Sequence, residues 1–106
     1  MIKLEDFEKL DLRVGKVVEV TKVPKSQKLY KIMVDIGDKK IKIISSLADY
    51  YSEEEMLNKK IIVLVNLEPA KFRDETSEGM LLCAENVKDC VLLTVDRDID
   101  LGTRIT

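Results

Sequence analysis

Residues 66–80, NLEPAKFRDETSEGM, carry the side chains in this chain best suited to binding a ligand. The stretch contains two cations, Lys71 and Arg73, and two hydroxyls, Thr76 and Ser77. Lysine and arginine can bind an anion, and hydroxyl groups both donate and accept hydrogen bonds. An apolar run precedes the stretch and another follows it, at 61–65 and 81–84. The sequence therefore predicts a loop of polar side chains held between two buried strands.

Catalytic chemistry has little support among the other residues. The chain has no histidine, which excludes histidine-ligated metal hydrolysis and the Ser-His-Asp and Cys-His nucleophilic schemes. Cys83 and Cys90 are seven residues apart, which fits neither a redox pair nor the usual zinc spacing, so we expect reduced, packed thiols. An enzyme using lysine and carboxylates stays an alternative, but no carboxylate pair stands out. We therefore predict no enzyme, no metal and no cofactor.

The charge is unevenly distributed along the chain. The total is −2, yet residues 13–42 carry nine bases and three acids, whereas residues 43–106 carry seven bases and thirteen acids. A basic segment can steer an anionic partner. The alternative is a lysine-rich sheet face that only contacts water.

Short apolar segments separated by turn residues indicate mostly β structure. Leu4, Phe7 and Leu10 recur at helical spacing, so residues 4–10 are predicted to form a short helical segment. Ser52 and Glu55 form a capping box for a second one, and Asn58 is a left-handed stop. Gly15 suggests a bulge or bend in the first strand. The predicted strands are 13–23, 29–36, 41–45, 60–67, about 80–84 and 91–95.

Three strands, one helical segment and further strands are the element order of an OB-fold. We therefore predict an all-β protein, a five-stranded Greek-key barrel with a short helical segment, as one domain over residues 1–106. An SH3-like barrel or a small mixed α+β sheet is the alternative, since periodicity does not give strand order. In an OB-fold, the loop at 66–80 would join strands four and five and take part in ligand binding.

Four motifs in order resemble those of the tRNA-binding domain family, which includes the C-terminal part of methionyl-tRNA synthetases and stand-alone tRNA-binding proteins. The motifs are Asp11-Leu-Arg-Val-Gly-Lys-Val17, Lys28-Leu-Tyr30, Asn66-Leu-x-Pro-x-Lys-x-Arg73 and Ser77-x-Gly-Met80. The resemblance covers residues 7–103. It implies an OB-fold that binds tRNA by its folded shape, without catalysis.

The resemblance also implies RNA-binding residues. Lys28 and Lys71 would contact phosphates, and Arg73 would contact a phosphate or stack on a base. Asn66 and Ser77 would bind sugar hydroxyls or base edges, unless Asn66 bonds the backbone of its loop and Ser77 caps a turn. Met80 would face a splayed base, unless it lies in the core. Gly79 would allow close approach of backbone to the RNA. Tyr30 and Ser45 complete the predicted set.

The resemblance implies a tRNA-binding module, with tRNA as its partner, that stands alone or acts in trans as an accessory subunit of methionyl-tRNA synthetase. The lack of a secretory signal at residues 1–6 and of a membrane span predicts a cytoplasmic protein. Apolar residues near both ends suggest a homodimer: Leu4, Phe7, Leu10, Val91, Leu92, Leu93 and Ile105. No segment is apolar enough to span a membrane. The alternative function is a chaperone-like or protein-interaction domain, which the secretion-linked branch of the same family represents. Glu68 and Asp74 would oppose a phosphate, so tRNA affinity should be modest and sensitive to salt.

Overall fold

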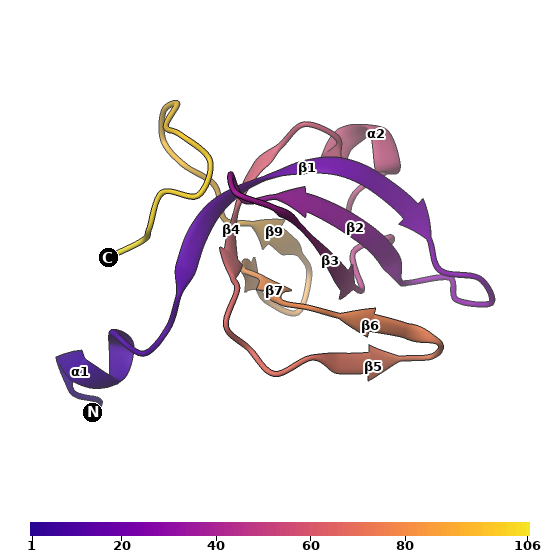
Figure 1. The fold of residues 1–106 in the computed structure, drawn as a ribbon. Coiled ribbons are helices and arrows are strands. Elements are labelled where there is room, and N and C mark those ends of the chain that lie inside the picture. The colour runs from indigo at the N-terminus through magenta and orange to yellow at the C-terminus, as the bar shows by residue number, and fades with distance from the viewer.

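Five antiparallel strands form a nearly closed barrel, with two short helices and two small hairpins attached (Figure 1). The computed structural model describes all 106 residues of the chain. The elements in chain order are α1 (Leu4–Phe7), β1 (Leu12–Lys22), β2 (Tyr30–Asp35), β3 (Lys40–Ser45), α2 (Glu53–Met56), β4 (Lys60–Leu64), β5 (Ala70–Phe72), β6 (Glu75–Ser77), β7 (Met80–Leu81), β8 (Cys83–Glu85) and β9 (Cys90–Leu92).

The strand order in the barrel is β3-β2-β1-β4-β7. β1 is long enough, at eleven residues, to pair with β2 along one part and with β4 along another. The barrel closes where residues 77–78 meet β3. There the amide of Glu78 donates to the carbonyl of Lys42 at 2.7 Å, and the amide of Ile44 donates to Ser77 Oγ at 3.0 Å. With α2 between the third and fourth barrel strands, this topology confirms the predicted OB-fold.

Alternation of apolar and polar residues places the core inside the barrel. In β2 every second residue is buried, beginning with Tyr30, as expected for a strand with one face inward. A second, smaller apolar cluster lies elsewhere on β1 and β4, and Phe7, Leu101 and Ile105 from the two ends of the chain pack against it. The termini are therefore part of the packed structure.

The loop at 66–80 contains a hairpin of its own, β5–β6, which we call the arm. Ala70 pairs with Ser77 and Phe72 pairs with Glu75, leaving Arg73 and Asp74 in the turn at the tip. In Figure 1 the arm projects along the lower edge of the barrel, with β6 nearer to β3 than β5 is. The sequence predicted a loop here and not a hairpin.

Several local predictions can be compared with the structure. Ser52 and Glu55 do form a capping box, and Asn58 does have a positive φ, of 71°. Both helices have four residues, so α1 is shorter than the predicted segment 4–10. Neither helix has the length or apolar character to cross a membrane.

Gly15 is not at a bulge. The register shift lies between Val17 and Glu19, whereas Gly15 pairs regularly with Ile61. A Cβ at Gly15 would lie 2.5 Å from Cγ1 of Val34. Close packing against side chains of the two neighbouring strands, β2 and β4, therefore explains this glycine.

Candidate nucleic-acid interface

The loop between β1 and β2, residues 23–29, adjoins the tip of the arm. Lys25 from the loop and Arg73 from the tip line the same cavity, of about 250 Å³, which Asp74 and Glu75 of the arm also line. Lys28 is exposed on the same loop, and Lys71 is exposed on the arm. The fold thus brings together, at one end of the barrel, four cations from two segments that are far apart in the sequence. Of these, Lys25 was not among the predicted site residues.

Lys25 and Arg73 both have left-handed backbone conformations. Their φ angles are 66° and 57°, a region that costs a residue with a Cβ about 1–2 kcal/mol. Such conformations are concentrated at functional sites. No sequence pattern indicated this feature of Lys25, because glycine or asparagine is the usual residue in that conformation.

The arm is fixed to β3 by polar contacts along β6. Lys42 Nζ lies 3.1 Å from Oε1 of Glu75, and the buried hydroxyl of Ser77 accepts from the amide of Ile44. Because Ser77 points at the barrel, its cross-strand partner Ala70 shares that face. Lys71 lies on the opposite face of the arm, since neighbouring residues of a strand alternate.

Tyr30 is a core residue, which corrects its predicted place at the RNA surface. It is 2% exposed, and its hydroxyl donates to the carbonyl of Tyr51 at 2.8 Å. Burial raises the pKa of this phenol above its ordinary value. Its ring cannot stack on a base without opening the barrel.

Ser77 and Gly79 also face inward. The Ser77 hydroxyl donates to the carbonyl of Gly79 and accepts from Ile44, so both bonds are internal. A Cβ on Gly79 would lie 2.7 Å from the carbonyl oxygen of Leu64. Packing within the chain is therefore enough to require this glycine.

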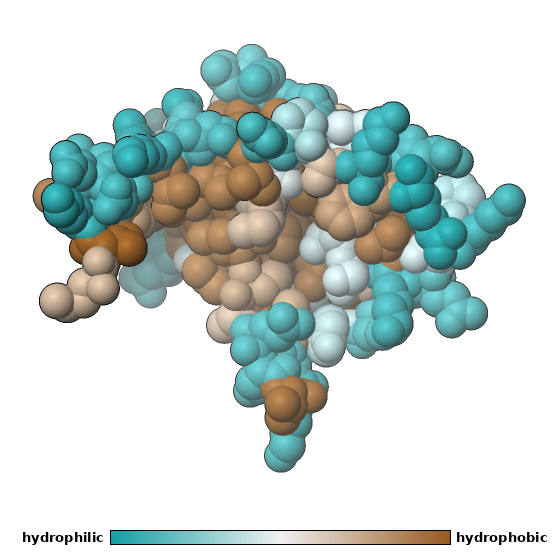
Figure 2. Space-filling view, turned by 90° about the horizontal axis from the view of Figure 1, so that it is seen from below, coloured by the Kyte–Doolittle hydropathy of each residue, from teal (hydrophilic) through white to brown (hydrophobic).

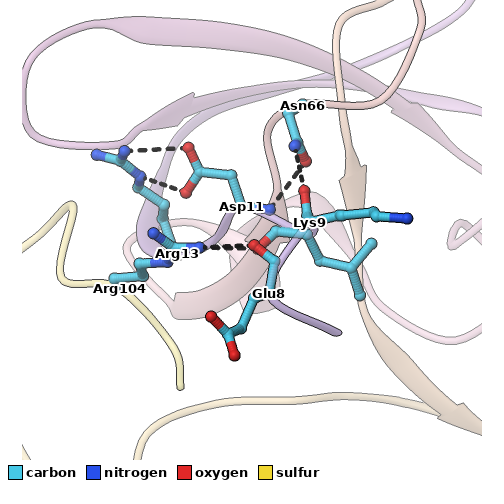
Figure 3. Close-up of polar contacts among 7 residues, drawn as sticks. Glu8, Lys9, Asp11, Arg13, Asn66 and Arg104 are labelled. Carbon is cyan, nitrogen blue, oxygen red and sulfur yellow. Dashed lines mark hydrogen bonds and ion pairs between the residues drawn. The ribbon is translucent and has the colours of Figure 1, made fainter. Parts of the chain in front are cut away.

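Asn66 joins the start of the 66–80 segment to the N-terminal segment (Figure 3). Its Oδ1 accepts from the amide of Asp11 at 2.9 Å, and its Nδ2 donates to the carbonyl of Lys9 at 2.7 Å. Arg104 from the C-terminal end donates to the carbonyls of Glu8 and Leu10. Asn66 therefore bonds backbone, but the backbone of the N-terminal segment and not that of its own loop.

Asp11 also pairs with Arg13, as Figure 3 shows. The guanidinium donates to both carboxylate oxygens of Asp11, at 2.8 and 3.0 Å. These bonds lower the pKa of Asp11 and raise that of Arg13.

The remaining predicted residues reach the surface. Met80 is 45% exposed, and Ser45 is half-buried at the end of β3. Phe72 on the arm is also exposed and was not in the predicted set. Two carboxylates, Glu68 and Asp74, are exposed in the same segment as Lys71 and Arg73 and oppose their positive charge.

The two cysteines are packed. Cys90 is buried and Cys83 half-buried, and neither is in a disulfide. Burial, together with contact with Cys90, raises the pKa of the Cys83 thiol to about 12. Such a thiol is a poor nucleophile at neutral pH.

Residues 12–104 match the family described as "Putative tRNA binding domain". The chain belongs to this tRNA-binding domain family. Its OB-fold, and the place of the arm between β4 and β7, agree with the element order predicted for such a domain.

Known proteins similar to this tRNA-binding domain include methionine–tRNA ligases and CsaA chaperone proteins. It is 47% identical, over 104 residues, to the methionine–tRNA ligase of Archaeoglobus fulgidus, and the match covers 98% of this chain and 16% of the ligase. The chain thus spans about a sixth of that relative's length.

Solved structures give the same fold. A MetRS-related protein from Pyrococcus horikoshii superposes with a TM-score of 0.94 at 34% identity, covering 100% of this chain and 98% of that one. The CsaA chaperone protein from Picrophilus torridus superposes with a TM-score of 0.92 at 33% identity, covering both chains fully.

Proposed function

We propose that this domain is a non-catalytic module that binds folded tRNA through the β1–β2 loop and the arm. The observation that carries the proposal is the cavity shared by Lys25 and Arg73, with Lys28 and Lys71 exposed on the same two segments. These four cations offer several contacts to a polyanion on a chain whose net charge is −2, and Asp74 and Glu75, which line the same cavity, offset part of their charge.

Phosphate contacts supply most of the binding in such an interface. Lysine side chains act as mobile point charges, and Arg73 can form a two-pronged contact with a phosphate. Each neutralised phosphate releases counterions, so affinity falls steeply as salt rises. Glu68 and Asp74 reduce the local field and make the affinity modest.

The ligase relatives support a role beside an aminoacyl-tRNA synthetase, and we propose the methionyl enzyme. A domain that holds tRNA next to the synthetase raises the local concentration of its substrate without adding chemistry. The cytoplasm, where tRNA is charged, is the compartment that fits this role.

A second copy of the chain fits the apolar surface near the termini. Leu4, Phe7, Leu10 and Ile105 line a cavity of about 510 Å³, together with Glu8, Arg104 and Thr106. Leu4 is 74% exposed. Figure 2 views the molecule from below and shows a broad apolar area with polar borders. Exposed apolar surface of this kind marks interaction sites, and we propose that it pairs two copies about a twofold axis.

A chaperone-like function is the second candidate, favoured by the similarity to the CsaA structure. Salt dependence separates the two candidates. Binding to tRNA should weaken steeply with salt, whereas binding of an apolar peptide should be nearly indifferent to it.

The experiment is a filter-binding titration with folded tRNA on the wild-type chain and on the double variant Lys71→Ala, Arg73→Ala. We expect the double variant to bind at least about tenfold more weakly, with the urea midpoint unchanged, because both residues are exposed. An unchanged dissociation constant would remove the arm from the interface.

A further inference from the structure

An apolar notch lies at the base of the arm. Its lining contains five apolar residues from the arm, the 66–80 segment and the barrel: Ile44, Leu67, Ala70, Phe72 and Met80. Glu68, Ser77 and Gly79 also line it, and the notch has a volume of about 90 Å³.

Large apolar side chains around this notch are unusually exposed for a barrel whose interior is well packed. Leu67 and Met80 are each 45% exposed and Phe72 is 42% exposed. Phe72 alternates with Lys71, so it lies on the same face of the arm as Ala70 and Ser77, the face that meets Ile44. The face of the arm toward the barrel therefore carries the apolar Ala70 and Phe72 beside Ser77 and Glu75, and Lys71 lies on the other face.

We propose that this notch accepts one unstacked nucleobase of the bound tRNA. The inference rests on the proposed function and adds the chemistry of one contact. A phosphate is a poor occupant, since no cation lines the notch and Glu68 would repel it. A base is a better one, because its faces are apolar and its edge carries N–H groups that a carboxylate accepts.

Size and surroundings support a base over other ligands. Small-molecule sites usually have volumes of about 300–1,000 Å³, well above that of this notch. Phe72 offers a ring on which a base can stack, and thioether sulfur packs well against aromatic rings. Lys71 and Arg73, beside Phe72 in the sequence, can hold the phosphates on either side of the base.

The test compares Phe72→Ala, Phe72→Leu and Val87→Ala in titrations with folded tRNA at several salt concentrations. Val87 is fully exposed in the turn between β8 and β9 and serves as the control for loss of an exposed apolar side chain. We expect Phe72→Ala to weaken binding about fivefold or more, the lower end for loss of base stacking on an aromatic ring. Phe72→Leu should fall between it and the wild type, and Val87→Ala should match the wild type.

The slope of log K against log salt separates this contact from the charges. Stacking releases no counterions, so Phe72→Ala should keep the wild-type slope, whereas Lys71→Ala should reduce it. Met80→Ala, expected to weaken binding in the same way, checks the notch from a second element. Urea midpoints verify that each variant is folded.

The outcomes distinguish this inference from the proposed function. If tRNA binding depends on Lys71 and Arg73 but not on Phe72 or Met80, the notch does not hold a base, and the proposed function still stands. Absence of any tRNA binding by the wild type would overturn the proposed function and the notch with it. If the Phe72 variants keep tRNA binding but lose binding to a permanently unfolded polypeptide, the occupant is a peptide side chain and the inference is wrong.

Discussion

Polar side chains in the motifs of this domain have two different roles. Lys28, Lys71 and Arg73 are exposed and can contact a ligand. Asn66 and Asp11 instead bond within the chain and fix its N-terminal segment. A motif residue can therefore affect binding without touching the ligand, because it fixes the position of another segment of the chain.

The Asp11–Arg13 pair gives a prediction for pH. The pKa of Asp11 is lowered in the folded protein, so the unfolded chain binds more protons in acid. The stabilisation is complete above the ordinary aspartate pKa of about 3.9 and is lost as pH falls through the lower, folded value. For a partly exposed pair it is less than about 1 kcal/mol.

We expect Asp11→Asn to lower the urea midpoint at pH 7 and to have little effect near pH 2. Asp49→Asn, a change at an exposed carboxylate, is the control and should shift neither value. An Asp11→Asn deficit of the same size at both pH values would show that ion pairing is not the cause.

For single residues, the sequence predicted well which charged side chains are exposed. It predicted less well whether side chains with a hydroxyl face the core or the surface. The charges Lys28, Lys71 and Arg73 were placed at the surface because burying them costs too much. Tyr30 and Ser77 can face either way, because each can satisfy its hydroxyl inside the protein, as both do here. Periodicity alone did not decide their side.

The arm is the element on which the candidate site depends. Its two strands have three residues each and pair along their length. Contacts of Glu75, Ser77 and Glu78 attach it to β3. Two-stranded hairpins are marginally stable alone, so these contacts to the barrel define its position. The sequence did not predict it, since strands this short leave no periodic signal, whereas β1, β2 and β3 are long enough to show theirs.

Gly79 tests how the arm rejoins the barrel. A methyl group at Gly79 would meet the carbonyl oxygen of Leu64, part of a rigid strand. We expect Gly79→Ala to lower the free energy of unfolding by about 1–3 kcal/mol, as overpacking does, measured by urea denaturation. The loss of stability should be present without any ligand, because the clash is within the chain.

The opposite pattern would contradict this account. A Gly79→Ala variant with the wild-type urea midpoint would mean that the chain has room for a methyl group at this position.

Across the whole molecule, three surface regions differ in the charge and polarity of their side chains. Cations gather at the β1–β2 loop and the arm tip, the termini form an apolar cavity, and the C-terminal segment carries acids such as Asp96 and Asp98. The barrel was predictable from alternation and element order. The meeting of Lys25 with Arg73 was not, because it depends on how the barrel closes.

The apolar surface predicts an effect on assembly. We expect the wild type to sediment as a dimer at micromolar concentration, and Leu4→Glu to sediment as a monomer, since it places a charge in the contact. Val87→Glu, at an exposed site in the turn between β8 and β9, should remain dimeric. A wild type that stays monomeric at every concentration would refute the proposed pairing.

The central claim, that one end of the barrel contacts the tRNA phosphates, is tested most directly by the salt dependence of two charge-matched triple variants. One replaces Lys28, Lys71 and Arg73 with alanine, and the other replaces the exposed Lys59, Lys88 and Arg97. We predict that the first lowers the magnitude of the slope of log K against log salt by about 2–3, as loss of three phosphate contacts should, and that the second leaves it unchanged. Equal slopes for the two variants would contradict the account, because binding would then depend on total charge and not on this surface.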